Sequence, residues 1–126
     1  MAVTCTNVTL SRDTVAVLAP DAATADTENL AEVFTITPTK RTDKMIIEVA
    51  VAAANGTVAC SLGAGSYWAA KAQTFNAVQN KTSVFHISDI ARFMTAAGKI
   101  LLTLTPATDK KLKTNHAATV QVIELP

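Results

Sequence analysis

The two histidines are the side chains in this sequence that could serve most readily as an acid or a base. His86 lies in a stretch where apolar and polar residues alternate, and His116 follows Lys113-Thr-Asn in a predicted loop. Neither lies near a Gly-x-Ser-x-Gly turn or any other distinctive nucleophile context, by which a hydrolase of the serine type would be recognised. The sequence therefore favours a protein that is not an enzyme.

Cysteine usage argues against a metal centre. Cys5 and Cys60 are the two cysteines of the chain, whereas a structural zinc site normally takes four ligands at close, regular spacing. Cys60 alternates with Val58 and Leu62, so we expect it to be a small buried hydrophobic side chain. The sequence leaves open whether it pairs with Cys5. We expect no metal and no cofactor, because 126 residues can bury a core without them.

One glycine-rich stretch and one aromatic pair have the composition of binding elements. Gly63-Ala-Gly-Ser lacks the Lys-Ser/Thr that completes a phosphate-binding loop, so a turn is expected there. Tyr67 and Trp68 follow it and carry apolar bodies with polar tips. Such a pair suits either a protein contact or a lid over the open end of a core.

Charge is balanced overall but unevenly distributed. The chain has 11 basic and 10 acidic residues, which disfavours direct binding to nucleic acid, where many cations must act together. Residues 1–32 carry a net charge of −4 and residues 66–126 one of +4. Lysines are densest in the predicted loop at Lys110–Lys113, called the basic loop. We hypothesise that the acidic N-terminal segment of one copy lies near the basic loop of a neighbour. The candidate interaction residues are Tyr67, Trp68, Lys110, Lys111, Lys113 and His116.

The elements that must position these residues are predicted to be strands. The chain holds 23 Ala, 19 Thr and 12 Val against 9 Leu, a bias typical of pleated, half-buried surfaces. Alternation of period two predicts strands, and Asn55-Gly56 predicts a tight hairpin whose two strands pair directly. The predicted strands are 32–37, 44–53, 57–62, 75–78, 82–88, 99–105 and 118–125, with 15–18 and 4–10 as further candidates.

Short strands without intervening helical segments predict an all-β fold. We expect one domain over residues 1–126, an antiparallel β-sandwich or jelly roll of seven to nine short strands with at most one short helix or 3-10 turn, at 88–94. Residues 21–29 are expected to be an exposed loop, and residues 1–30 could form an extended N-terminal arm. The chain opens without a basic, apolar leader and has no apolar run near the roughly 20 residues that span a bilayer, so we expect neither a secretory signal nor a membrane contact.

Several segments resemble small β-sandwich virion proteins of tailed bacteriophages, of the capsid decoration or auxiliary head protein type. They are distributed over residues 30–126 and are Phe34-Thr-Ile-Thr-Pro-Thr-Lys, Asp43-Lys-Met-Ile-Ile-Glu-Val, Asn55-Gly-Thr-Val, Gly65-Ser-Tyr-Trp, Ala91-Arg-Phe, Lys99-Ile-Leu-Leu-Thr-Leu-Thr-Pro and Val120-Gln-Val-Ile-Glu-Leu.

The resemblance implies a structural protein that is made in the host cytoplasm and binds the outer surface of a phage head, where it stabilises the shell. The implied partners are the major capsid protein and further copies of the chain itself, a trimer being one such assembly. Repeated weak contacts on a lattice would then replace a deep pocket. Two alternatives stay open: a tail, neck or adaptor component of the virion, and an Ig-like module that binds a surface or a glycan.

Overall fold

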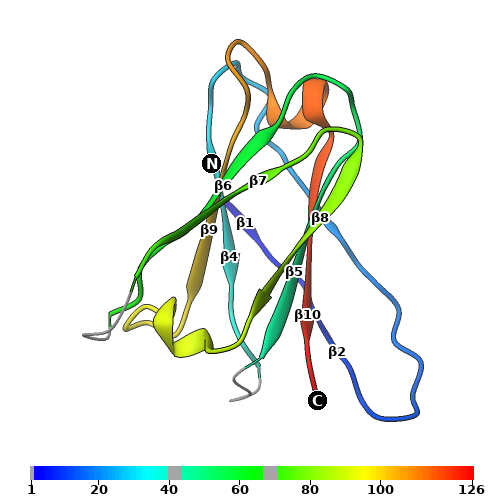
Figure 1. Cartoon of the computed structure of the whole chain (residues 1–126), viewed down its shortest axis with the longest axis vertical. Helices are drawn as coiled ribbons and strands as arrows, with labels where there is room; N and C mark the ends of the chain where they lie inside the picture. Colours follow the sequence, from blue (N-terminus) through cyan, green and yellow to red (C-terminus); the bar gives the residue numbers. More distant parts are fainter. Residues whose placement is uncertain (1, 40–43, 67–70) are drawn as a thin grey trace.

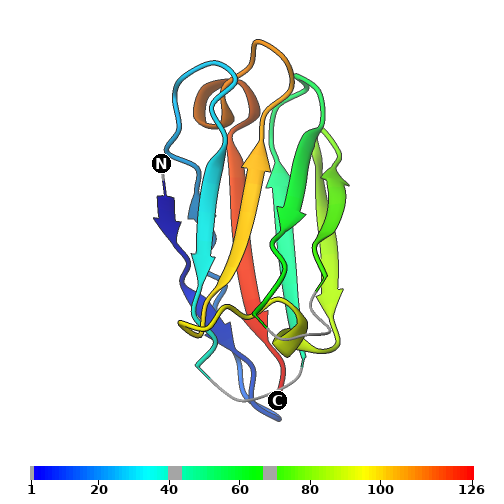
Figure 2. The ribbon, with the colours of Figure 1, turned by 90° about the vertical axis from the view of Figure 1, so that its left-hand side faces the viewer.

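In the computed structural model, two β-sheets pack face to face. The structure describes residues 2–39, 44–66 and 71–126. The first sheet runs in the order β1 (Ala2–Thr4), β4 (Glu32–Ile36), β9 (Ile100–Thr105), β6 (Val58–Leu62) and β7 (Gln73–Ala77). The second runs β2 (Asn7–Thr9), β10 (Ala118–Glu124), β5 (Met45–Val51) and β8 (Lys81–Ile87), and the short β3 (Asp21–Ala22) also pairs with β10. Figures 1 and 2 show the two layers from directions 90° apart.

Alternation along the strands builds the core between the sheets. Every second residue of β5 is buried, and the same period-two burial holds along β4 and β6, as expected where one face of each strand meets the opposite sheet. The large side chains that meet there, all less than 2% exposed, include Phe34, Ile36, Met45, Ile47, Leu62, Ile87, Ile100, Leu102 and Leu104. Burying one such side chain contributes about 1.5–3 kcal/mol, so this layer supplies the main stabilisation of the fold.

The predicted all-β sandwich is confirmed, with two corrections. There are ten strands among the described residues rather than seven to nine. The sheets are also mixed, because β1 pairs parallel with β4 and β2 pairs parallel with β10. The N-terminal segment thereby crosses from the edge of one sheet to the edge of the other.

The predicted Asn55-Gly56 hairpin is wrong. Gly56 adopts a φ of 103°, which suits a turn, but the strands on either side do not pair. Instead, β5 pairs with β10 and β8 in the second sheet, and β6 pairs with β7 and β9 in the first. The turn carries the chain across the sandwich from one layer to the other.

The short helix or 3-10 turn predicted at 88–94 is found as a 3-10 turn, and a second short turn lies before β10. A 3-10 turn, η1 (Ile90–Arg92), begins at Asp89, whose side chain accepts from the Ala91 amide at 3.1 Å. A π turn, η2 (Leu112–His116), precedes β10 and ends at Ala117 in the left-handed conformation. Within the described ranges, no helix is long and apolar enough to cross a membrane.

Candidate interaction surface

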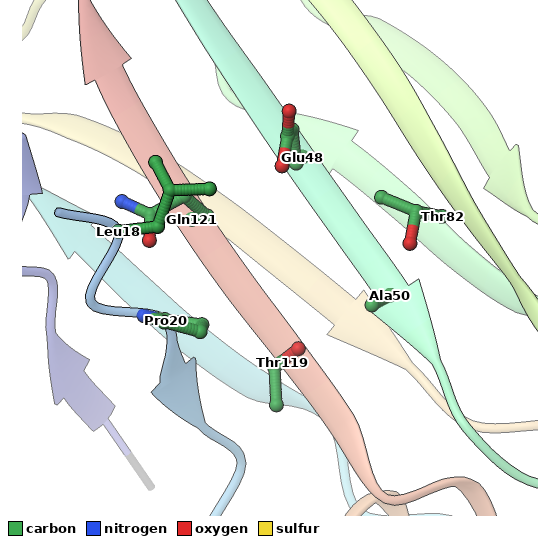
Figure 3. A pocket seen from close by; sticks show the side chains of 7 residues that line it. All are labelled: Leu18, Pro20, Glu48, Ala50, Thr82, Thr119 and Gln121. Carbon is green, nitrogen blue, oxygen red and sulfur yellow. The ribbon is translucent and has the colours of Figure 1, made fainter. Parts of the chain in front are cut away.

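The last residues of the loop formed by residues 10–20 lie against the outer face of the second sheet. It joins β2 to β3, and the predicted strand at 15–18 is not formed there. Leu18 and Pro20 of this loop, with side chains of β5, β8 and β10, line a shallow groove of about 180 Å³ (Figure 3). The residues from the sheet are Glu48, Ala50, Thr82, Thr119 and Gln121.

The same loop exposes apolar side chains. Val15 is 90% exposed, Val17 81% and Leu18 50%. On β8, Val84 projects from the outer face of the same sheet with 60% exposure. Burying any of these branched side chains against another protein would be favourable, because it removes apolar area from water. These four exposed apolar side chains, Val15, Val17 and Leu18 on the loop and Val84 on β8, are together called the apolar outer surface, and they are the strongest candidates for a protein contact.

The basic loop contacts the acidic N-terminal segment of the same chain. Lys111 Nζ lies 4.0 Å from an Asp26 carboxylate oxygen, and the Thr114 hydroxyl donates to the same Asp26 side chain. The Asn29 side-chain Nδ2 donates to Asp109 at 3.2 Å, and the Asn29 backbone N–H donates to the Lys110 carbonyl at 3.0 Å. The acidic and basic segments thus meet within one copy. This contact within one chain takes up part of the charge pairing that the hypothesis placed between neighbours.

His116, a predicted contact residue, is instead fully buried, so it offers no surface to a partner in this fold. Its Nε2 accepts from the Ala107 amide at 3.2 Å, which leaves the proton of the neutral ring on Nδ1. Nδ1 has no hydrogen-bond partner within the described part of the chain. Burial, and secondarily the nearby Lys110, lowers the pKa of His116 below its usual value.

The remaining predicted contact residues have different settings. Lys113 is exposed, whereas Lys110 and Lys111 are half-buried. Tyr67 and Trp68 lie outside the described residues. The glycine stretch before them is irregular, with a bend at Ser66. It packs on residues 92–94, because the Gly65 backbone amide donates to the Arg92 carbonyl and the Ser66 backbone amide to the Met94 carbonyl, both at 3.0 Å.

Both cysteines are free thiols. Cys60 is 2% exposed, which confirms the predicted buried hydrophobic role. Burial raises the pKa of Cys60 to about 12, and burial together with Asp21 raises the pKa of Cys5 to about 12. Within the described ranges no group of three or more His, Cys, Asp and Glu side chains could hold a metal ion.

Sequence reasoning missed two buried carboxylates that hold loops to strands. Glu32, at the start of β4, accepts from the Thr24 amide at 2.7 Å and from the Thr24 hydroxyl at 2.6 Å. Glu124, at the end of β10, accepts from the Thr39 amide at 2.9 Å and from the Thr39 hydroxyl. Both glutamates are fully buried. Alternation places Glu32 on the same face of the strand as Phe34, so the sequence pattern could have predicted that Glu32 is buried.

The chain has no match among protein-family models, curated proteins or solved structures. Its function therefore has to be argued from its own residues.

Proposed function

We propose that this protein is a non-catalytic structural component of a virion, which binds the outer surface of a tailed-phage head and stabilises it. The resemblance of residues 30–126 to auxiliary head proteins supplies the partner, the major capsid protein. The observation that carries a binding role is the apolar outer surface, where Val15 and Val17 are 90% and 81% exposed.

The polar groups of the sandwich support this proposal. Glu32 and Glu124 are buried and bound to threonines, and His116 is buried beneath its own loop, where it binds the Ala107 amide. These groups stabilise the fold. The large apolar side chains that are exposed in the described part of the chain include Val15, Val17, Leu18 and Val84, and these suit contact with another protein surface.

A tail, neck or adaptor position in the virion is the second candidate. The same exposed valines would serve there equally well, since a fold of this kind can occupy several positions in a particle. The location of the binding partner distinguishes the two candidates.

The test is to mix purified protein with heads of the encoding phage assembled without it and to image the particles by electron cryomicroscopy. Added density at regular positions on the outer shell is expected. Density only at the portal, neck or tail would support the second candidate, and absence of density anywhere on the virion would refute both.

A further inference from the structure

Residues 14–18 form a strand-like segment that lacks a sheet. The sequence Thr-Val-Ala-Val-Leu has the composition of a strand, yet the structure gives it no strand pairing with the described residues. Val15 and Val17, two residues apart, would lie on the same face of an extended chain, and they are the two most exposed large hydrophobic side chains described. The segment therefore has unsatisfied apolar surface and a backbone outside any described sheet.

The second sheet ends at β8, and among the described residues no further strand pairs with the outer edge of β8. In that sheet β8 is seven residues long and pairs with β5 on one side, and it is outermost among the described strands (Figure 2). Edge strands are usually protected by proline, bulges or inward-pointing charges. Residues 82–87 of β8 contain no proline and no Lys, Arg, Asp or Glu, and all seven residues pair with β5 without a bulge.

The segment cannot reach the β8 edge of its own copy. Asp21 pairs with Val120 of β10, and from β3 the chain would have to pass β10, β5 and β8 to lie beyond them. Four strand spacings of about 4.8 Å amount to roughly 19 Å, whereas the three residues from Leu18 to Asp21 extend to about 10 Å. Residues 14–18 can therefore pair with a β8 edge only when that edge belongs to a second copy.

We propose that residues 14–18 of one copy add as an antiparallel strand to the β8 edge of another copy. In the register that we infer, Val17 lies opposite Val84 and Val15 opposite His86. Arg12 precedes the added strand and Asp89 follows β8, so these opposite charges lie at the same end of the antiparallel pair, although the left-handed turn at Asp13 keeps Arg12 out of strand register. Val15, Val17 and Val84 then share one outer face and cover one another.

Such an exchange joins two different surfaces, the loop of one copy and the far edge of the next. A head-to-tail contact of this kind closes into a ring or continues as a chain. The inference rests on the proposed function only in treating the exposed valines as a protein contact.

The first test uses purified protein without heads, so that it can fail independently of head binding. A Val17→Cys variant is mixed with a Val84→Cys variant under oxidising conditions, and disulfide-linked dimers are measured by mass. We expect dimers linked between positions 17 and 84, well above those formed when Val17→Cys is mixed with Leu101→Cys. Leu101 is a matched control because it is an exposed apolar residue on the first sheet.

The second test separates strand pairing from simple apolar contact. Successive amides of a strand point to opposite sides, so one of Ala16→Pro and Val17→Pro removes a donor to β8 and the other does not. In sedimentation experiments at increasing protein concentration, we expect wild-type protein to associate and one proline variant to associate at least about tenfold more weakly than the other, a difference of roughly one lost hydrogen bond.

Circular dichroism of both proline variants serves as the control for folding, and only variants with the wild-type spectrum are compared. The inference is overturned if wild-type protein stays monomeric at all concentrations, if Val17→Cys links to Leu101→Cys as readily as to Val84→Cys, or if both prolines have equal effects. Monomeric protein whose residues 14–18 become protected on heads would overturn it too, and would assign the segment to the capsid protein instead.

Discussion

Glu32 and Glu124 perform the same task at different places in the sandwich. Each lies at a strand end and receives both the amide and the hydroxyl of one threonine. A charged acceptor strengthens such hydrogen bonds, and two donors from one residue fix the position of a loop. Glu32 fixes the loop before β4 through Thr24, and Glu124 fixes the segment that follows β4 through Thr39.

Glu32→Gln is expected to lower the free energy of unfolding by about 1.5–3 kcal/mol, because an amide nitrogen replaces one of the two acceptor oxygens facing Thr24. Urea denaturation measures this loss. The control is Glu28→Gln, which changes an exposed carboxylate on the same loop and should cost no more than about 0.5 kcal/mol. Equal effects of the two variants would show that the Glu32–Thr24 contact does not stabilise the fold.

Acid should destabilise the protein through His116. Protonation would place a hydrogen on Nε2, which now accepts from Ala107, so two donors would face each other in a buried site. The lowered pKa of His116 means that the unfolded chain binds the proton more readily than the folded chain. The unfolding free energy should therefore fall as pH drops below about 6.5, the ordinary histidine pKa.

Urea denaturation over a series of pH values tests this dependence. His116→Gln should flatten the slope between neutral pH and the range where carboxylates titrate, even if the variant is less stable overall. His86→Gln, at an exposed position on β8, should keep the wild-type slope. A slope unchanged in His116→Gln would contradict the assignment.

At the scale of elements, the segment of residues 63–66 holds the end of β6 against η1. A Cβ at Gly65 would lie 2.6 Å from the Met94 carbonyl oxygen and 2.9 Å from that of Arg92, whereas one at Gly63 would lie 3.8 Å from its nearest neighbour. Both obstacles at Gly65 are backbone atoms, which cannot move aside cheaply.

Gly65→Ala is therefore expected to cost about 1–3 kcal/mol of unfolding free energy, and Gly63→Ala less than about 1 kcal/mol. Thermal or urea denaturation of the two variants, two residues apart in the same segment, gives the comparison directly. Equal stabilities would mean that the segment does not pack against residues 92–94.

Alternation predicted the strands well because burial on one face imposes a period of two. The phases of Phe34 and Ile36, and of Met45 through Val51, are those observed. Pairing was predicted poorly, because Asn55-Gly56 encodes a turn and not the sheet to which the next strand returns. The 15–18 segment carried a strand pattern without a neighbour in the described part of its own chain, and the burial of His116 depends on contacts that its local sequence does not encode.

At the scale of the whole molecule, one surface distinguishes this sandwich. The acidic and basic segments that the sequence separates are joined within one copy by Asp26 and Lys111, so part of the chain's charge asymmetry is used internally. The valines of the 10–20 loop instead stay largely exposed. The account therefore assigns contact with other proteins to the apolar outer surface.

The most direct measurement is the binding isotherm of purified protein on phage heads assembled without it, for wild type and for Val15→Ser/Val17→Ser. Two exposed serines should leave folding intact while removing the apolar area through which copies pair on the shell, so we expect binding to weaken at least about tenfold, the equivalent of roughly 1.4 kcal/mol. Leu101→Ser, on the other sheet, should bind as wild type. Equal binding of the double variant and wild type would contradict the assignment of the contact to this surface.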